Sequence, residues 1–189
     1  MKHMTQSLRL TTAAILFSVA LFSCKKETPE ANDEEVITTV LVKLTPVTGG
    51  NAVSFSYEDL DGPGGNNPVI QPISLQANKA YTASLLVLNK TVNPADTVSN
   101  EILAEADAHR FYYEPSAGSN INVAGLDTDG NGVPLGLNSV WNAGNAGTGT
   151  MKITLRHYPG TPPNKEASDP VNSTKSSTDI ELTFNTTIQ

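Results

Sequence analysis

The chain has 189 residues, and its 12 lysines and arginines face 19 aspartates and glutamates, which gives a formal net charge of −7. An acidic surface repels phosphate backbones, so this composition argues against nucleic-acid binding and supplies no basic patch for an anionic membrane. A single cysteine cannot close a disulfide within the chain, so packing alone has to hold the domain together.

The first 23 residues have the pattern of a bacterial export signal, in which a basic start precedes an apolar run. Residues 10–22 carry no charge, and this stretch is too short to cross a bilayer as a helix. It ends in Leu21-Phe22-Ser23-Cys24, which resembles the lipobox of bacterial lipoproteins. We therefore expect residues 1–23 to be a lipoprotein signal peptide, and Cys24 to carry the lipid, palmitate included.

Residues 24–35 are expected to be the lipidated cysteine and a flexible acidic tether. The stretch KKETPEANDEE has no large apolar side chain, so it cannot bury enough surface to offset its ordering entropy. Cleavage leaves 10 basic and 19 acidic side chains, a formal net charge of −9. Attachment to the membrane then depends on the acyl chains, and we expect the protein in the cell envelope, on the outer membrane, facing the periplasm or the surface.

Period-two patterns of apolar side chains predict that residues 36–189 form a mainly β domain. Val40, Val42 and Leu44 share one face of the first strand, and the turn at Gly49-Gly50-Asn51 leads into a second strand over residues 53–57. Further strands are predicted, in chain order, over residues 69–75, 81–88, 110–114, 121–126, 139–142, 151–157 and 179–184.

One helix interrupts these strands. Asn93-Pro94 marks its start, and it is expected to end near His109. Four apolar residues fall on one stripe at helical spacing: Val98, Ile102, Leu103 and Ala106.

The predicted fold is an immunoglobulin-like antiparallel β-sandwich with one short helix. One-sided alternation in eight or nine short strands favours antiparallel sheets around a shared core. Two long loops, over residues 59–68 and 159–177, are candidates for function because loops of this length are uncommon in compact domains.

The sharpest motif of the domain is Asp127-Thr128-Asp129-Gly130-Asn131-Gly132. Oxygen-bearing side chains at positions 1, 3 and 5, with glycine at position 6, gather hard ligands in calcium loops. Asn138 stands at position 12, where the helix-loop-helix version has a glutamate. Asp127, Asp129 and Asn131 are therefore candidate Ca²⁺ ligands, with the Val133 carbonyl as a fourth donor, and a plain turn between strands is the alternative.

Two further features concern single residues. His157 falls in the inward phase of its strand, where a core-edge histidine bonded to a neighbour is favoured over a ligand or a base. With His109 it could in principle clamp a haem, although no attachment motif supports this. Asp96-Thr97-Val98 matches a bacterial O-glycosylation signal, which makes Thr97 a candidate glycan site.

The chain is not expected to be an enzyme. The sequence contains no nucleophile elbow, no metalloprotease helix motif and no phosphate loop. A small hydrolase is accordingly the last of the alternatives.

Several segments together resemble a family of small Bacteroidota envelope lipoproteins. They are the SCKK start, the acidic tether, and the stretches FSYEDLDGPGG, EILAEADAHRF and LRHYPG. The resemblance covers most of residues 20–189, and it implies an envelope location and a β-fold but no catalytic residues. We expect a lipid-anchored protein that binds an envelope protein, a small molecule or a glycan through its loops, and the alternative is a calcium-stabilised structural module.

Overall fold

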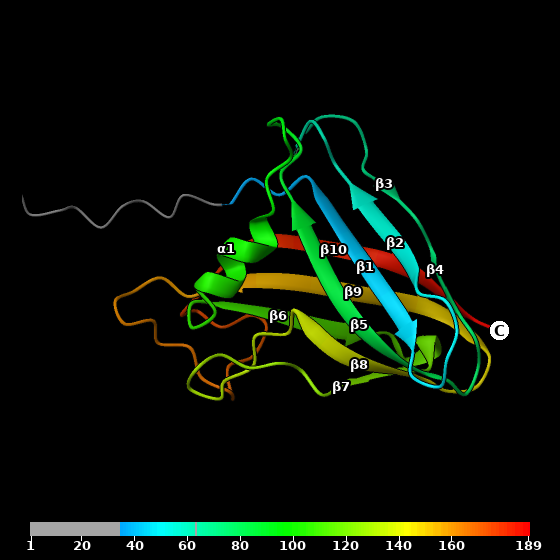
Figure 1. Ribbon diagram of the computed structural model, residues 1–189. Helices are drawn as coiled ribbons and strands as arrows, with labels where there is room; N and C mark the ends of the chain where they lie inside the picture. Colours follow the sequence, from blue (N-terminus) through cyan, green and yellow to red (C-terminus); the bar gives the residue numbers. More distant parts are fainter. Residues whose placement is uncertain (1–34, 63) are drawn as a thin grey trace, which may run out of the picture. The chain divides into compact units, whose positions relative to one another are not determined.

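The computed structural model describes residues 35–62 and 64–189, which form two β-sheets packed face to face and one α-helix (Figure 1). The elements, in chain order, are β1 (Thr39–Pro46), β2 (Val53–Glu58), β3 (Val69–Ile70), β4 (Ile73–Leu75), β5 (Ala80–Leu88), α1 (Val98–Ala104), β6 (His109–Pro115), a 3-10 turn (Ala117–Ser119), β7 (Ile121–Ala124), β8 (Asn138–Ala143), β9 (Gly147–His157) and β10 (Ser177–Ile188). The larger sheet has six strands in the order β3-β2-β1-β5-β8-β7, and the smaller has four in the order β4-β10-β9-β6. The predicted mainly β sandwich with one short helix is confirmed.

Alternating apolar side chains on the inner faces of both sheets form the core. Val40, Val42 and Leu44 of β1 are fully buried, as their period-two spacing predicts, while Lys43 between them is exposed. From the smaller sheet, Phe184 of β10 is also fully buried. Both sheets therefore turn one face to the core and the other outward.

The predicted strand over residues 69–75 is wrong as a single element. β3 pairs with β2 in the larger sheet, whereas β4 pairs with β10 in the smaller one. The chain changes sheets at Gln71-Pro72, where proline offers no amide hydrogen to a ladder. The β4–β10 pairing is parallel, so the smaller sheet is mixed rather than purely antiparallel.

The helix is shorter than predicted at both ends. Asn89 and Asp96 form a β-bridge, so the segment before α1 is not helical. At the other end, His109 begins β6 instead of closing the helix. Ile102 is buried as the stripe predicts, but Leu103 is 57% exposed.

The long segment between β9 and β10 lies against the smaller sheet. Arg110 Nη1 donates to the carbonyl oxygens of Glu166 and Ala167, each at 3.1 Å. Arg156 Nη2 donates to the carbonyl oxygen of Ser173 at 2.9 Å. The predicted loop is thus present, and two arginines of neighbouring strands fix its path.

The predicted signal peptide over residues 1–23, Cys24 and the tether up to residue 34 lie outside the described residues. Within residues 35–62 and 64–189, no helix has the length and apolar character needed to span a membrane.

Candidate functional site

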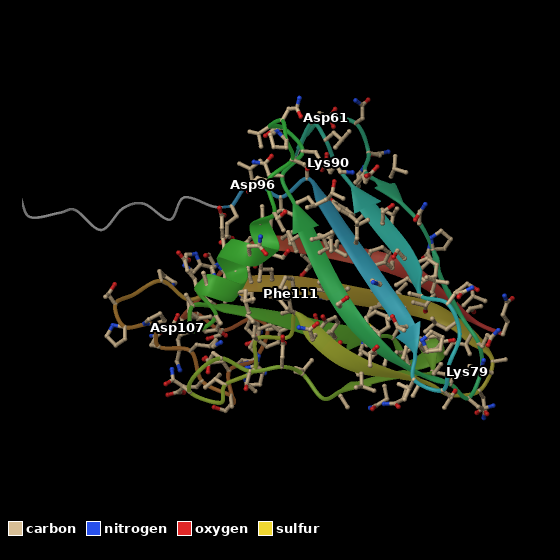
Figure 2. All side chains as sticks on the ribbon, in the orientation of Figure 1. Asp61, Lys79, Lys90, Asp96, Asp107 and Phe111 are labelled. Atoms are coloured by element: carbon tan, nitrogen blue, oxygen red, sulfur yellow. The ribbon has the colours of Figure 1, made fainter. Side chains whose placement is uncertain are left out.

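A cleft of about 360 Å³ opens between the start of the described chain, the end of β2 and the start of β10. It lies at the end of the larger sheet that Asp61 and Lys90 mark in Figure 2, opposite the end marked by Lys79. Among its lining residues are four carboxylates and no lysine, arginine or histidine. The carboxylates are those of Glu35, Asp59, Asp61 and Asp179. The cleft is therefore a negatively charged site.

Apolar side chains share the lining with these carboxylates. Val36 is 55% exposed and Leu60 is 59% exposed, although both are large and apolar. Tyr57 adds an aromatic ring, and its pKa is raised by burial and by the neighbouring Asp59 carboxylate. The lining thus combines negative charge with exposed apolar surface.

Hydrogen bonds within the loop after β2 hold two of the carboxylates in place. Asp59 Oδ1 accepts from the Gly62 amide at 3.0 Å. Asp61 Oδ2 accepts from the Asn66 amide at 2.9 Å, and this bond lowers the pKa of Asp61. Asp61 therefore remains ionised at neutral pH, and the loop presents its charge in a defined position.

A second group of polar side chains lies at the same end, on three neighbouring strands of the smaller sheet. His109 of β6 and His157 of β9 are directly paired in the ladder, and their rings stack with centroids 4.7 Å apart. The β9–β10 register shifts between Thr178 and Ile180, so Asp179 is the extra residue of a bulge. A bulge changes the direction of a side chain, and here the ligand atoms of the two histidines and Asp179 lie within 4.8 Å of one another.

His109 is fully buried between two oxygen acceptors. Its Nδ1 lies 3.1 Å from the carbonyl oxygen of Glu105, and its Nε2 lies 2.9 Å from Glu35 Oε1. Nδ1 carries a hydrogen, which it donates to the carbonyl, so Nε2 of a neutral ring has none. Since Nε2 faces a carboxylate, it needs a second proton or another cation there. Burial favours the neutral ring, but the hydrogen bond and charge of Glu35 outweigh it and raise the pKa of His109.

His157 has the opposite electrostatic setting. Burial and the neighbouring His109 lower the pKa of His157, so this ring is neutral at neutral pH. It lies half-buried at the edge of the core against His109, as its inward phase predicts. The contact between the two rings leaves no room for a haem between them.

The oxygens of the predicted calcium ligands accept hydrogen bonds from N–H groups. Asp127 Oδ1 accepts from the Gly136 amide at 2.8 Å. Asp129 Oδ1 accepts from the amides of Asn131 and Val133 at 2.8 and 2.9 Å. The Asn131 side chain is exposed, and the Val133 carbonyl accepts from the Asp129 amide. This geometry is that of the alternative, a turn closed by aspartate side chains, and Ca²⁺ binding stays a prediction.

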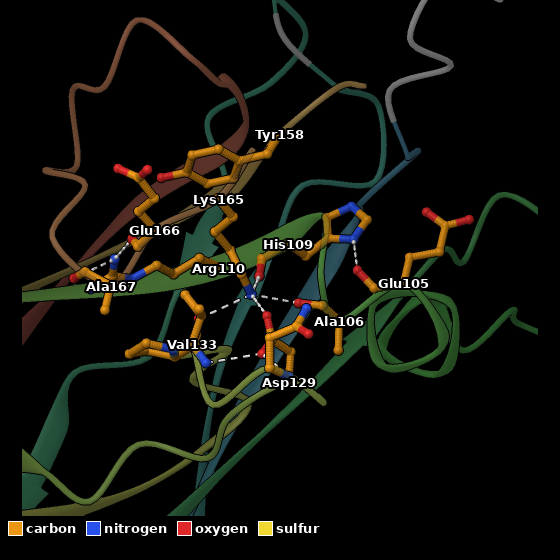
Figure 3. Close-up of polar contacts among 12 residues, drawn as sticks. Glu105, Ala106, His109, Arg110, Asp129, Val133, Tyr158, Lys165, Glu166 and Ala167 are labelled. Atoms are coloured by element: carbon orange, nitrogen blue, oxygen red, sulfur yellow. Dashed lines mark hydrogen bonds and ion pairs between the residues drawn. The ribbon is translucent and has the colours of Figure 1, made fainter. Parts of the chain in front are cut away.

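A buried lysine supplies a cation next to this turn. Lys165 Nζ lies 2.9 Å from Asp129 Oδ2, and the two side chains are 1% and 2% exposed. Nζ also donates to the carbonyl oxygens of Ala106 at 2.6 Å and His109 at 2.9 Å (Figure 3). Burial alone would raise the pKa of Asp129, but Lys165 and the loop amides together lower it. Sequence reasoning missed Lys165, because it stands in a polar, proline-containing segment without periodicity.

The candidate glycan site, Thr97, is the N-cap residue of α1. Its side chain is half-buried and makes no capping hydrogen bond, and the adjacent Asp96 is exposed (Figure 2). O-glycosylation at Thr97 stays a prediction.

No family model matches the chain, and neither a curated protein nor a solved structure is significantly similar to it. The resemblance to Bacteroidota lipoproteins therefore stays a prediction.

Proposed function

We propose that the protein is a lipid-anchored binding protein of the cell envelope, whose acidic cleft takes a cationic ligand with an apolar part. The observation that best supports this proposal is the lining of the cleft, with four carboxylates, no basic side chain, and the exposed Val36 and Leu60. A short peptide with a lysine or arginine next to an apolar residue has the matching chemistry.

The charge of the cleft and its apolar surface contribute to binding of such a ligand in different ways. Carboxylates gathered in a concave site concentrate the negative potential, which raises the local concentration of cations. When an apolar group of the ligand covers Val36 and Leu60, the removal of their side chains from water lowers the free energy of the complex. The two contributions select a ligand that carries both kinds of group.

The lipid anchor is the first testable part of the proposal. Protein isolated from cells is expected to partition into detergent, and mass spectrometry should find an acylated N-terminal peptide that begins at Cys24. The variant Cys24→Ser should move the protein to the aqueous phase, because the acyl chains supply the membrane affinity. Ser23→Ala keeps a small residue before the cysteine and should remain anchored. An unmodified thiol at Cys24 would contradict the anchor.

The ligand class is tested by titrating the purified lipoprotein in detergent with short peptides in a calorimeter. A peptide that pairs lysine with leucine should bind, and its affinity should fall as sodium chloride is added, because salt screens the carboxylates. A matched peptide with glutamate in place of lysine should not bind. Leu60→Ser is expected to cost about 1 kcal/mol of binding free energy, or about fivefold in Kd.

Val47→Ser is the matched control for Leu60→Ser. Val47 is 56% exposed, and it is not among the residues that line the cleft. The control should bind the lysine peptide as the unaltered protein does. Equal binding of lysine and glutamate peptides, or equal losses in the two variants, would remove the cleft as the binding site.

A further inference from the structure

Three neighbouring strands bring metal-ligating side chains to one point of the smaller sheet. β6 contributes His109, β9 contributes His157, and the bulge of β10 contributes Asp179. We infer that these three residues bind a divalent transition metal ion, with Zn²⁺ as the best fit, and that Glu35 completes the coordination.

The donor set matches the chemistry of zinc. Zn²⁺ in proteins takes imidazole nitrogens and carboxylate oxygens, most often four in a tetrahedron, and two histidines with acidic residues are a known kind of set. Bonds of about 2.0–2.2 Å place such ligand atoms about 3.3–3.5 Å apart. The ligand atoms of His109, His157 and Asp179 lie within 4.8 Å of one another, so side-chain movements of about 1 Å close the site.

The orientation of His109 is already fixed for coordination. Its Nδ1–H donates to the carbonyl oxygen of Glu105, 3.1 Å away, which leaves Nε2 as the ligand atom. Metal-binding histidines are commonly oriented in this way, by a hydrogen bond from the ring nitrogen that does not bind the metal. The ring is fully buried, so its Nε2 is shielded from bulk water.

Glu35 provides a second and independent indication of a cation. Its Oε1 lies 2.9 Å from His109 Nε2. Its Oε2 is buried and accepts no hydrogen bond from any residue in the described part of the chain. Buried carboxylate oxygens are costly without a donor or a cation. A metal ion between Glu35 and His109 satisfies both groups at once, whereas a shared proton satisfies only one carboxylate oxygen.

This inference does not rest on the proposed peptide ligand. The metal site uses the histidines, which do not line the cleft, and it shares only Glu35 and Asp179 with the cleft lining. Metal binding is measured without any peptide, so either proposal can fail while the other holds.

The test is a titration of the full-length lipoprotein, in detergent and stripped with a chelator, with ZnCl₂ in a calorimeter. One Zn²⁺ per chain is expected, together with a rise in Tm, because an ion that binds only the folded state stabilises it. CoCl₂ should give the visible absorption of a tetrahedral site without a thiolate band. His157→Ala and Asp179→Asn should each weaken Zn²⁺ binding at least about tenfold, since even residues outside the coordination shell contribute that much.

Asp107→Asn is the matched control, because Asp107 is an exposed carboxylate near His109 in sequence and is not one of the four proposed ligands (Figure 2). It should bind Zn²⁺ as the unaltered protein does. In the unaltered protein, the ring NMR signals of His109 and His157 should also shift when Zn²⁺ is added, which tests the site even if a variant does not fold. Absent binding, ring signals that stay in place, or full affinity in both ligand variants would overturn the inference.

Discussion

Replacement of the buried lysine, Lys165→Met, is expected to lower the free energy of unfolding by about 3–5 kcal/mol, the cost of removing one partner from a buried ion pair. The substitution leaves the Asp129 carboxylate in a site where its side chain is 2% exposed. It also removes the donor shared by the carbonyl oxygens of Ala106 and His109. Urea unfolding followed by the fluorescence of Trp141, the only tryptophan, measures the change.

Lys43→Met is the control for this experiment, because Lys43 is exposed on β1. Its effect should stay within about 0.5 kcal/mol, as for most surface substitutions. The double variant Lys165→Met/Asp129→Asn should recover part of the loss, because no buried charge is left without its partner and asparagine keeps a side-chain oxygen for the amides of Asn131 and Val133. Equal unfolding free energies for Lys165→Met and Lys43→Met would show that the ion pair does not stabilise the fold.

The second large effect is expected for Phe184→Ala, which should cost about 3–5 kcal/mol through lost apolar burial and the cavity left behind. Phe184 is fully buried on β10 and lies directly opposite Met151 of β9. The neighbouring Thr183 is exposed, so Thr183→Ala is a control at the adjacent position of the same strand. The urea midpoint should fall for Phe184→Ala and remain nearly unchanged for Thr183→Ala, with the same slope in both. Similar midpoints for the two variants would be inconsistent with the described core.

Strands with strict alternation were predictable, because every second residue of such a strand is apolar and faces the core. Val40, Val42 and Leu44 gave the inner face of β1 correctly. The break at Gln71-Pro72 was missed, although proline interrupts a ladder, because Val69-Ile70 and Ile73-Ser74-Leu75 both look like strand and only the tertiary pairing sends them to different sheets. The helical spacing of apolar residues also predicted a helix up to His109, but His109 pairs with β9 in the smaller sheet.

The candidate sites were less predictable than the fold. His157 was correctly placed inward, but its pairing with His109 depends on the register of two strands far apart in sequence. Asp179 only marked the start of the predicted strand over residues 179–184, and the bulge is what brings it near the histidines. Lys165 gave no signal at all, since a lysine in a polar segment is usually solvated. Such sites depend on contacts between segments far apart in sequence, and the periodicity of side chains along one strand carries no information about those contacts.

The two arginines that fix the segment before β10 have a consequence for how this region can change. Arg110 binds carbonyl oxygens, which every amino acid carries, whereas Arg156 binds the Ser173 carbonyl oxygen and also donates to the Ser176 hydroxyl at 3.0 Å. An exchange at Ala167 therefore keeps the acceptor that Arg110 uses. Exposed positions such as Ala167 can therefore diversify while the segment retains its course, which makes them suitable places to attach a fluorophore or an epitope.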